Sequence, residues 1–335
     1  MEIFSNGQWL PLVFMVLMGV AILAYVILDG YDLGVGILMS RADNSEKDLM
    51  IASIGPFWDA NETWLVLGVG ILLVAFPIAH GIILTSLYFP VALMLTGLIL
   101  RGVSFDFRAK ARDHHKHLWD KTFMAGSLLT AVSQGYMLGS YIVGFEFNLI
   151  NFAFGVLAGF CLAAGYCLMG ASWLIMKTEG VLQIKSVKWA RFGLWGTVLG
   201  MVVISLATPL ISHRIFDKWF SLPNFFFLLP IPAITLALII LLETSLRKLP
   251  RHEDKHCWVP FVGSVGLFVL GFLGLGYSFY PYIVPERMTI WQAASAPESL
   301  MIILIGALVV LPCIIVYTIF AYRVFWGKVK ELTYH

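Results

Sequence analysis

The sequence predicts an all-α, polytopic membrane protein with nine transmembrane helices. Hydrophobic residues make up 59% of its 335 residues and charged residues only 13%, whereas about a quarter of the residues in soluble domains are charged. Nine apolar segments each reach the roughly 20 residues that a helix needs to cross a bilayer. Lysine and arginine fall mainly in alternate connections between these segments, as expected for correctly counted spans.

The nine predicted spans follow one another without a long linker, a repeat or a low-complexity tract, so 1–335 is interpreted as a single transmembrane domain. The first apolar run is too long for a signal-peptide core of roughly 7–15 residues, and we expect it to remain as a helix. The spans are predicted at 9–38, 63–79, 81–100, 122–145, 151–176, 190–212, 224–246, 259–280 and 299–325.

The basic residues also predict the orientation. Of the 22 lysines and arginines, 17 fall in the connections after spans one, three, five and seven and in the C-terminal tail, and Arg191 and Arg323 lie within three residues of the span ends that border them. Since basic residues accumulate on the cytoplasmic side, the N-terminus is predicted outside and the C-terminus in the cytoplasm. The stretch 280–292, which contains Pro281, Pro285 and Trp291, is then expected to form a short ordered loop on the outside.

Two aspartates interrupt the first span, in the stretch LDGYDLGVGIL from Leu28 to Leu38. Asp29 and Asp32 are three residues apart and therefore share one helix face, in the cytoplasmic half of the span. Inserting a carboxylate near the bilayer centre costs on the order of 3 kcal/mol of free energy, so such a group is expected to have a compensating partner or a function. Either the two acids fasten neighbouring helices, or they hold and pass protons. Gly30 and Gly34 are spaced to let another helix approach closely.

A second acidic stretch, PFWDANETW, leads into the second span. Pro56 can begin a helix, in which Asp59 and Glu62 share one face beside Trp58. This stretch enters the membrane from the same side as the first acidic pair, so four carboxyls are expected to converge there and could relay protons. The alternative is that the acids satisfy the free N–H groups at the helix start, which is the favoured interpretation for Glu62.

The most charged stretch is RGVSFDFRAKARDHHKHLWDK, residues 101–121. It is predicted to be a solvated cytoplasmic loop that fixes the orientation and meets anionic lipid headgroups. Within it, Asp106 could pair with Arg101 or Arg108 at the membrane border.

The eight histidines lie outside the interior of the predicted spans. His80 and His213 are placed at external helix ends, and the others in cytoplasmic connections or the tail. Because a haem between helices usually takes its axial histidine from within or near the spans, a transmembrane haem held by two histidines is not expected. The four cysteines lack the spacing of zinc ligands.

Together these motifs resemble subunit II of the cytochrome bd family of quinol oxidases. The resemblance rests on LDGYDLGVGIL, PFWDANETW, RGVSFDFRAK, YPYIVP and WQAASAP, in that order, and runs through almost the whole chain. The compact middle region resembles the cyanide-insensitive branch of the family. The resemblance implies a bacterial inner-membrane protein, with a periplasmic N-terminus, whose nine helices form two four-helix bundles and one peripheral helix.

The resemblance also implies a partner and cofactors. Subunit I is expected to carry haem b together with haem d, or haem b alone, and to oxidise ubiquinol near the outer face. Oxygen is then reduced to water with protons from the cytoplasm, which builds a proton-motive force. This chain is implied to be the haem-free, non-catalytic subunit, in contact with membrane lipids and not with nucleic acid. Some family members hold a structural quinone in this subunit, and the presence of a small single-helix subunit stays open.

The family's WD-N motif corresponds to Trp58, Asp59 and Asn61 in this sequence. The resemblance implies that Asp59 lies on a proton path near the subunit interface. Asp29 and Asp32 carry over as motif positions, and their proton role is inferred from their placement.

Two further motif residues carry less weight. Position 62 can be Gln in related proteins, which argues against an obligatory proton role for Glu62, and Asp106 carries over only as a motif residue. A proton-coupled secondary transporter is the alternative function, but such transporters often show internal repeats and paired broken helices, and neither is evident in this sequence.

Overall fold

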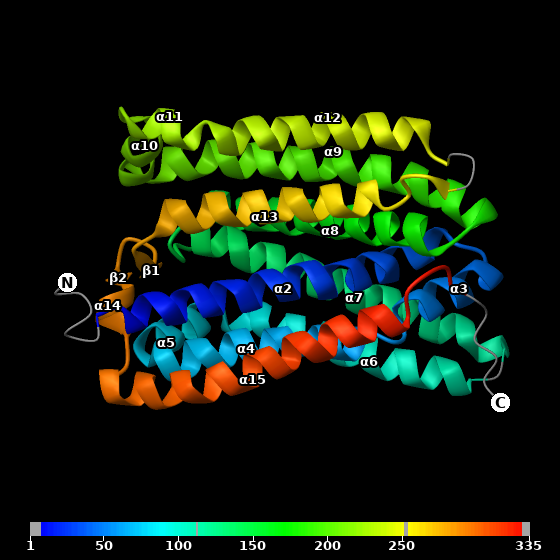
Figure 1. Ribbon diagram of the computed structural model, residues 1–335, viewed down its shortest axis with the longest axis horizontal. Coiled ribbons are helices and arrows are strands. Elements are labelled where there is room, and N and C mark those ends of the chain that lie inside the picture. Colours follow the sequence, from blue (N-terminus) through cyan, green and yellow to red (C-terminus); the bar gives the residue numbers. More distant parts are fainter. Residues whose placement is uncertain (1–7, 112, 251–253, 330–335) are drawn as a thin grey trace. The chain divides into compact units, whose positions relative to one another are not determined.

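The computed structural model describes residues 8–111, 113–250 and 254–329. Apart from one two-stranded hairpin, its regular structure is helical, so the predicted all-α class is confirmed. The chain divides into two compact units that are built from interleaved segments. Figure 1 gives the order of the elements along the chain.

The first unit combines the chain up to Asp29 with Gly55–Ser86 and Phe279–Gly327. Its core is a cluster of Ala21, Tyr25 and Trp64, against which side chains of the last helix pack. The elements of this unit are the first part of α2 (Leu10–Leu38), α4 (Trp58–Ala75), α5 (Pro77–Ser86), β1 (Tyr282–Val284), β2 (Met288–Thr289), α14 (Ile290–Ala293) and α15 (Pro297–Val324).

The stretch 280–292 is ordered, as predicted. Strands β1 and β2 pair antiparallel, and Thr289 and Gln292 form a capping box that starts α14. After this turn, the main-chain N–H of Ser295 donates to the carbonyl of Ala75 over 2.9 Å. The segment that follows α14 is therefore fastened to the end of α4 by a main-chain hydrogen bond.

The second unit combines Gly30–Ile54 with Leu87–Ser278 and the chain from Lys328 onward. Within it α6, α7, α8 and α9 pack as successive neighbours. Its elements are the last part of α2, η1 (Met39–Arg41), α3 (Asn44–Ile54), α6 (Tyr88–Lys110), α7 (Asp113–Ile142), α8 (Leu149–Lys177), α9 (Gly180–Ile211), α10 (His213–Phe220), α11 (Asn224–Leu228), α12 (Pro230–Lys248) and α13 (Val259–Phe279).

The end of α2 makes backbone contact with α8 through glycine. A Cβ atom on Gly34 would overlap the carbonyl oxygen of Tyr166, and one on Gly170 would lie 2.5 Å from the main-chain nitrogen of Val35. Gly30, one turn earlier, faces the ring of Tyr166. The predicted close approach of a second helix to this glycine face is confirmed.

Eight helices in the described part of the chain are long and apolar enough to cross a membrane. The helix α7, which contains most of the predicted span 122–145, is 30 residues long but more polar. Its buried face carries Ser127, Thr130 and Ser133, and hydroxyl groups lower the hydropathy of a segment without preventing helix formation. The structure is consistent with the predicted nine spans.

Several predicted boundaries are wrong, mostly because charged segments extend the helices instead of forming loops. The predicted loop 101–121 belongs largely to α6 and α7, and α3 begins at Asn44, within the predicted connection between the first two spans. Likewise α9 begins at Gly180 rather than near 190. The second predicted span ends early, at Ala75, because Pro77 has no N–H to continue the helix.

Candidate functional site

Helix α2 buries both of its aspartates. The side chains of Asp29 and Asp32 are 0% exposed, and the helix is unbroken from Leu10 to Leu38, so they lie one turn apart on one face. Ionised carboxylates are costly in such an environment unless other groups compensate for them. The structure therefore places these two acids on one face of one helix, as the sequence predicts, and buries them.

An aromatic stack holds the turn of α2 that carries Asp32. The ring of Tyr31 stacks on Trp173 of α8, with centroids 4.3 Å apart and an interplanar angle of 21°. The indole N–H of Trp173 donates to the carbonyl of Ser53 in α3 over 3.2 Å. Both rings are almost completely buried, so the orientation of this turn is fixed by packing on α8.

The WD-N motif forms the first turn of α4. Phe57 is the N-cap residue and provides no side-chain cap, and Asp59 lies in the first turn, where a carboxylate interacts favourably with the helix dipole. Asp59 is exposed, while Trp58 and Glu62 are half-buried. The dipole interaction agrees with the capping interpretation, which stays open beside the proton-path interpretation.

Asn61 connects this motif to the helix of the buried aspartates. Its side chain is 1% exposed, and its amide donates to the carbonyl of Leu28, the residue before Asp29, over 3.2 Å. Its own carbonyl oxygen accepts a hydrogen bond of 3.2 Å from the hydroxyl of Tyr322 in α15. The ring of Tyr322 stacks on Phe57, with centroids 4.5 Å apart. One amide therefore joins α2, α4 and α15.

The four predicted carboxyls do not share one environment. Asp29 and Asp32 are fully buried, Glu62 is half-buried and Asp59 is exposed in this chain. Their convergence on one proton path stays a prediction.

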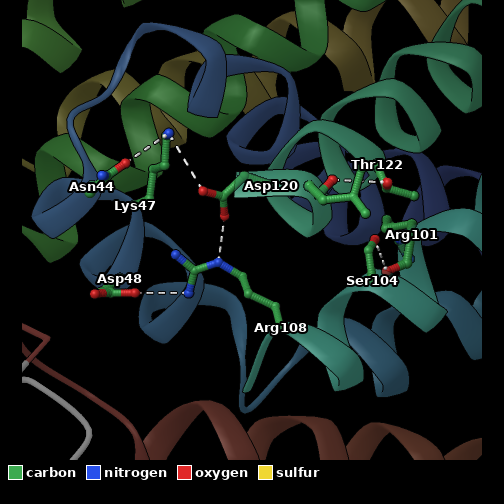
Figure 2. A network of polar contacts seen from close by, with 9 residues as sticks. Asn44, Lys47, Asp48, Arg101, Ser104, Arg108, Asp120 and Thr122 are labelled. Carbon is green, nitrogen blue, oxygen red and sulfur yellow. Dashed lines mark hydrogen bonds and ion pairs between the residues drawn. The ribbon is translucent and has the colours of Figure 1, made fainter. Parts of the chain in front are cut away.

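An ion-pair network that the sequence did not predict joins α3, α6 and α7 (Figure 2). The guanidinium of Arg108 contacts Asp48 over 2.8 Å and Asp120 over 2.5 Å. Lys47 lies 3.5 Å from the other oxygen of Asp120 and donates to Asn44 over 3.3 Å. The side chains of Arg108 and Asp120 are only 8% and 7% exposed, so this pair is largely shielded from solvent, whereas Asp48 is 54% exposed.

The suggested pairing of Asp106 with Arg101 or Arg108 is wrong. Asp106 is exposed, whereas Arg101, Ser104 and Arg108 are buried. These three residues occur at the i, i+3, i+7 spacing of a single helix face. This helical spacing is visible in the sequence. It was not recognised because 101–121 is predicted to be a solvated loop, and a loop has no helix face.

Two further ion-pair clusters fasten the second unit. Lys185 of α9 lies 2.8 Å from Asp43 and 2.9 Å from Glu46. The hydrogen bond and the charge of Lys185 hold the pKa of Asp43 below its ordinary value. This contact joins the start of α9 to the start of α3.

The second cluster holds the segment that follows α15. Lys328 lies 2.9 Å from Asp254 and donates to the carbonyl of Thr178 over 2.8 Å. Gln183 donates to the same carboxylate over 2.7 Å. Burial opposes ionisation of Asp254, but the hydrogen bonds from Lys328 and Gln183 outweigh it and hold its pKa below the ordinary value.

The histidines whose side chains the structure describes lie at helix ends or in connections. His80 is half-buried in α5, and the others are exposed; these are His115, His117, His213 and His256. His252 and His335 fall outside the described residues, as does the side chain of His114. Within the described part of the chain, no three His, Cys, Asp or Glu residues could hold a metal ion together. The described histidines therefore do not fit a haem held between the helices.

Comparison with known proteins agrees with the motifs. Residues 10–325 match the family described as cytochrome bd terminal oxidase subunit II. The cytochrome bd-I ubiquinol oxidase subunit 2 of Escherichia coli K12 is 26% identical in an alignment 369 positions long that covers 96% of each chain. The cytochrome bd ubiquinol oxidase subunit 2 of Bacillus subtilis 168 is 28% identical over 94% of this chain and 96% of its own.

A solved structure supports the fold. A chain in the structure of bd oxidase from Geobacillus thermodenitrificans superposes with a TM-score of 0.78, covering 94% of this chain and 98% of its own, at 15% sequence identity. At that identity the likeness is one of fold alone.

Proposed function

The chain belongs to the family of cytochrome bd terminal oxidase subunit II, and from this we propose that it is the haem-free subunit that conducts protons in a bacterial quinol oxidase. The complex resides in the inner membrane, which this chain crosses several times. Its partner is a haem-bearing subunit I. The single observation that carries the proton role is the amide of Asn61, which joins the turn of Asp59 to the turn of Asp29.

The haems of the complex belong to the partner in this proposal. In this chain the described histidines lie at helix ends and in connections, and a haem between helices needs an axial ligand that reaches its iron. The haems supply the electron transfer to oxygen. Haem b, with haem d or a further haem b, and the site of ubiquinol oxidation are therefore assigned to subunit I.

Reduction of oxygen to water consumes protons, and this chain's acids are suited to deliver them. Asp59 is exposed on the first turn of α4, so it can exchange a proton with water or with a group of the partner. Asp29 and Asp32 are fully buried and can hold a proton away from bulk water. Asn61 positions the two turns, because an amide keeps a fixed geometry but does not titrate.

The remaining site residues have supporting roles. Trp58 precedes Asp59 in the first turn of α4, and the half-buried Glu62 is not assigned an obligatory proton role. Asp106 is exposed on α6 and has no part in the path.

Orientation follows from the basic residues, with the N-terminus periplasmic and the C-terminus cytoplasmic. The two units share helix α2, which supports treating 1–335 as one membrane domain. We carry over from the family the arrangement of two four-helix bundles and a peripheral helix. The proposal also leaves room for a structural quinone in this subunit and for a small third subunit in the complex. The proton-coupled transporter gains no support from the family match.

The test is a purification through a tag on this chain, followed by a reduced-minus-oxidised spectrum and a quinol-driven oxygen-uptake assay. Haem that co-purifies with quinol oxidase activity is the expected result. A haem-free, inactive but folded chain without a partner would overturn the proposal and revive the transporter alternative. The proton role is tested separately with the Asp59 variant described below.

A further inference from the structure

One tryptophan of α8 contacts both the turn of the buried Asp32 and the end of α3. The ring of Trp173 stacks on Tyr31, the residue before Asp32. Its indole N–H donates to the main-chain carbonyl of Ser53, in the last turn of α3, which ends at Ile54. All of these residues belong to the second unit, so α2, α3 and α8 are joined there by a single side chain.

Further contacts fix the orientation of the Trp173 ring. Phe261 of α13 packs against both rings of the stack, with its centroid 5.3 Å from Trp173 and 5.8 Å from Tyr31. The ammonium group of Lys177, one turn later on α8, lies 5.0 Å from the indole centroid. The side chain of Trp173 is only 2% exposed. Because closely packed buried side chains rarely change rotamer, this ring is a rigid support for the turn on which it stacks.

A second aromatic residue of α8 supports the same stretch of α2. Tyr166 and Trp173 are seven residues apart, so they share one face of α8. The ring of Tyr166 lies against Gly30, since a Cβ atom there would be 2.7 Å from it, and its hydroxyl donates to Gln134 of α7 over 2.6 Å. Each ring is therefore anchored to a further helix, and together they hold the two residues between the buried aspartates.

Proton transfer depends on such support because it depends on distance. A proton passes between groups about 2.6–3.2 Å apart, or through one water, and a displacement of about 1 Å can slow a reaction 10²-fold. Asp32 directly follows the residue on which Trp173 stacks. Trp173 also holds the end of α3, and only 55–57 separate this end from α4, whose first turn carries Asp59.

We propose that Trp173 is a positioning residue of the proton path. It holds the turn of Asp32 fixed relative to the end of α3, and therefore relative to the segment that leads to Asp59. Trp173 carries no proton itself, because its indole N–H is a donor that does not titrate. This inference rests on the proposed proton role of the acids, and adds a residue from a different helix that is remote in sequence from both acidic motifs.

Two replacements in the assembled complex test this role. Trp173→Leu removes the ring and the N–H together, whereas β-(3-benzothienyl)alanine at position 173 keeps the ring and loses only the N–H. Oxygen uptake per haem is measured in H2O and in D2O over a range of quinol concentrations. We expect Trp173→Leu to lower kcat about tenfold with an unchanged KM for quinol. The ratio of the rates in H2O and D2O should rise, because proton delivery becomes the slowest step.

The benzothienyl variant should lose less activity, because its ring still supports the turn of Asp32. Its isotope ratio should nevertheless exceed that of the wild type, because the hydrogen bond to the end of α3 is gone. If Trp173→Leu does not assemble, this milder variant decides the question, and a wild-type isotope ratio in it would contradict the positioning role.

Trp219 of α10 provides a matched control. It also packs on a tyrosine, Tyr277, with centroids 5.9 Å apart, and donates its indole N–H to Ser278 over 2.8 Å. Helix α10 follows the C-terminal end of α9, whose other end contacts α3 through Lys185, and the 32 residues of α9 span about 48 Å. Trp219→Leu should therefore lower the melting temperature and leave the isotope ratio unchanged.

Several results would overturn the inference. These are a wild-type kcat in Trp173→Leu, a slow variant with an unchanged isotope ratio, and an equal rise of that ratio in Trp219→Leu. Asp32→Asn, measured in parallel, separates this inference from the proposed function. If Asp32→Asn is slow and Trp173→Leu is not, only the positioning role fails. If Asp32→Asn keeps full activity, the proton role of Asp32 fails, and the positioning role fails with it.

Discussion

The side-chain amide of Asn61 donates a hydrogen bond to the main-chain carbonyl of Leu28, over 3.2 Å. This bond ties the first turns of α4 to the turn of α2 that begins at Asp29. The carbonyl oxygen of the same amide accepts a hydrogen bond from Tyr322. Asn61 has no titratable proton, so it can fix the geometry near Asp29 and Asp59 without carrying a proton itself.

Replacing Asp59 by Asn tests the proton path directly. The change keeps the size and most of the hydrogen-bonding capacity but removes the titratable proton. We expect quinol-driven oxygen uptake to fall about 10²-fold, the lower end for loss of a proton-transfer group, with normal haem content. The matched control is Asp106→Asn, another exposed acid, which should keep full activity. Loss of haem in Asp59→Asn would indicate an assembly role instead, and full activity would remove Asp59 from the path.

Truncating Asn61 to Ala should destabilise the complex. The change leaves the Leu28 carbonyl and the Tyr322 hydroxyl without this partner inside the protein, and each lost buried hydrogen bond costs about 1–3 kcal/mol. Tyr322→Phe loses only the second bond, so its melting temperature should fall less. Thermal melting of the detergent-solubilised complex measures both, and equal melting temperatures for all three proteins would contradict the bridging role of Asn61.

A methyl group on Gly34 should disrupt the contact between α2 and α8. Because its Cβ would overlap the backbone of Tyr166, the helices must separate, at a cost of about 3 kcal/mol or more. Gly306→Ala on α15 is the control, since a Cβ there meets nothing within 4 Å. We expect Gly34→Ala to lower the yield of assembled complex and Gly306→Ala to leave it unchanged; equal yields would refute the tight contact.

The Arg108–Asp120 pair should behave as a coupled unit. Removing one partner of this shielded pair leaves the other with only its second contact, which is Asp48 for Arg108 and Lys47 for Asp120. Each change should therefore cost about 1–3 kcal/mol. We therefore expect Arg108→Gln and Asp120→Asn each to lower the melting temperature. The double variant should lose less stability than the sum of the two single losses, because the contact between the two side chains can be lost only once. Strictly additive losses would show that the two residues act independently.

The contact between Lys328 and Asp254 should depend on pH only in acid. The pKa of folded Asp254 lies below the ordinary carboxyl value, which is about 3.9. Its stabilising effect is therefore fully present above that value and is lost as the pH falls through the folded-state pKa. The two side chains are 26% and 30% exposed, so at neutral pH the pair contributes only about 0.5 kcal/mol.

Carboxypeptidase trimming of the purified complex measures this contact. Asp254→Asn and Lys328→Gln should each raise the trimming rate about twofold, equally at pH 7 and pH 5. A difference from the wild type that changes between these two pH values would contradict the assignment to Asp254.

The sequence predicted the fold class because bilayer-spanning helices need long apolar runs, which hydropathy detects directly. It also predicted the close approach at Gly34, because two small residues four apart in a membrane-spanning helix indicate a face on which another helix packs closely. The predicted helix boundaries are wrong where charged segments such as α3 are helical outside the apolar spans. There the apolar signal ends but the helix does not.

The candidate site was predictable only in part. Asp29 and Asp32 are evident because acids are rare in apolar runs, and their burial agrees with the prediction. The roles of Tyr322 and Leu28 were not predictable, because a tyrosine 261 residues away from Asn61 and a main-chain carbonyl have no local sequence signature. The exposure of Asp59 likewise depends on how α4 packs.

The interleaving of the two units has a consequence for how the protein is made. The core of the first unit brings Tyr25 and Trp64 together with Leu311 and Ile314 of α15. Since a ribosome releases the N-terminal helices first, α2 and α4 enter the bilayer long before the helix that completes their packing exists. Their unfilled faces must be shielded by the insertion machinery or by subunit I throughout synthesis, so a chain that terminates before α15 should be a substrate for membrane quality-control proteases.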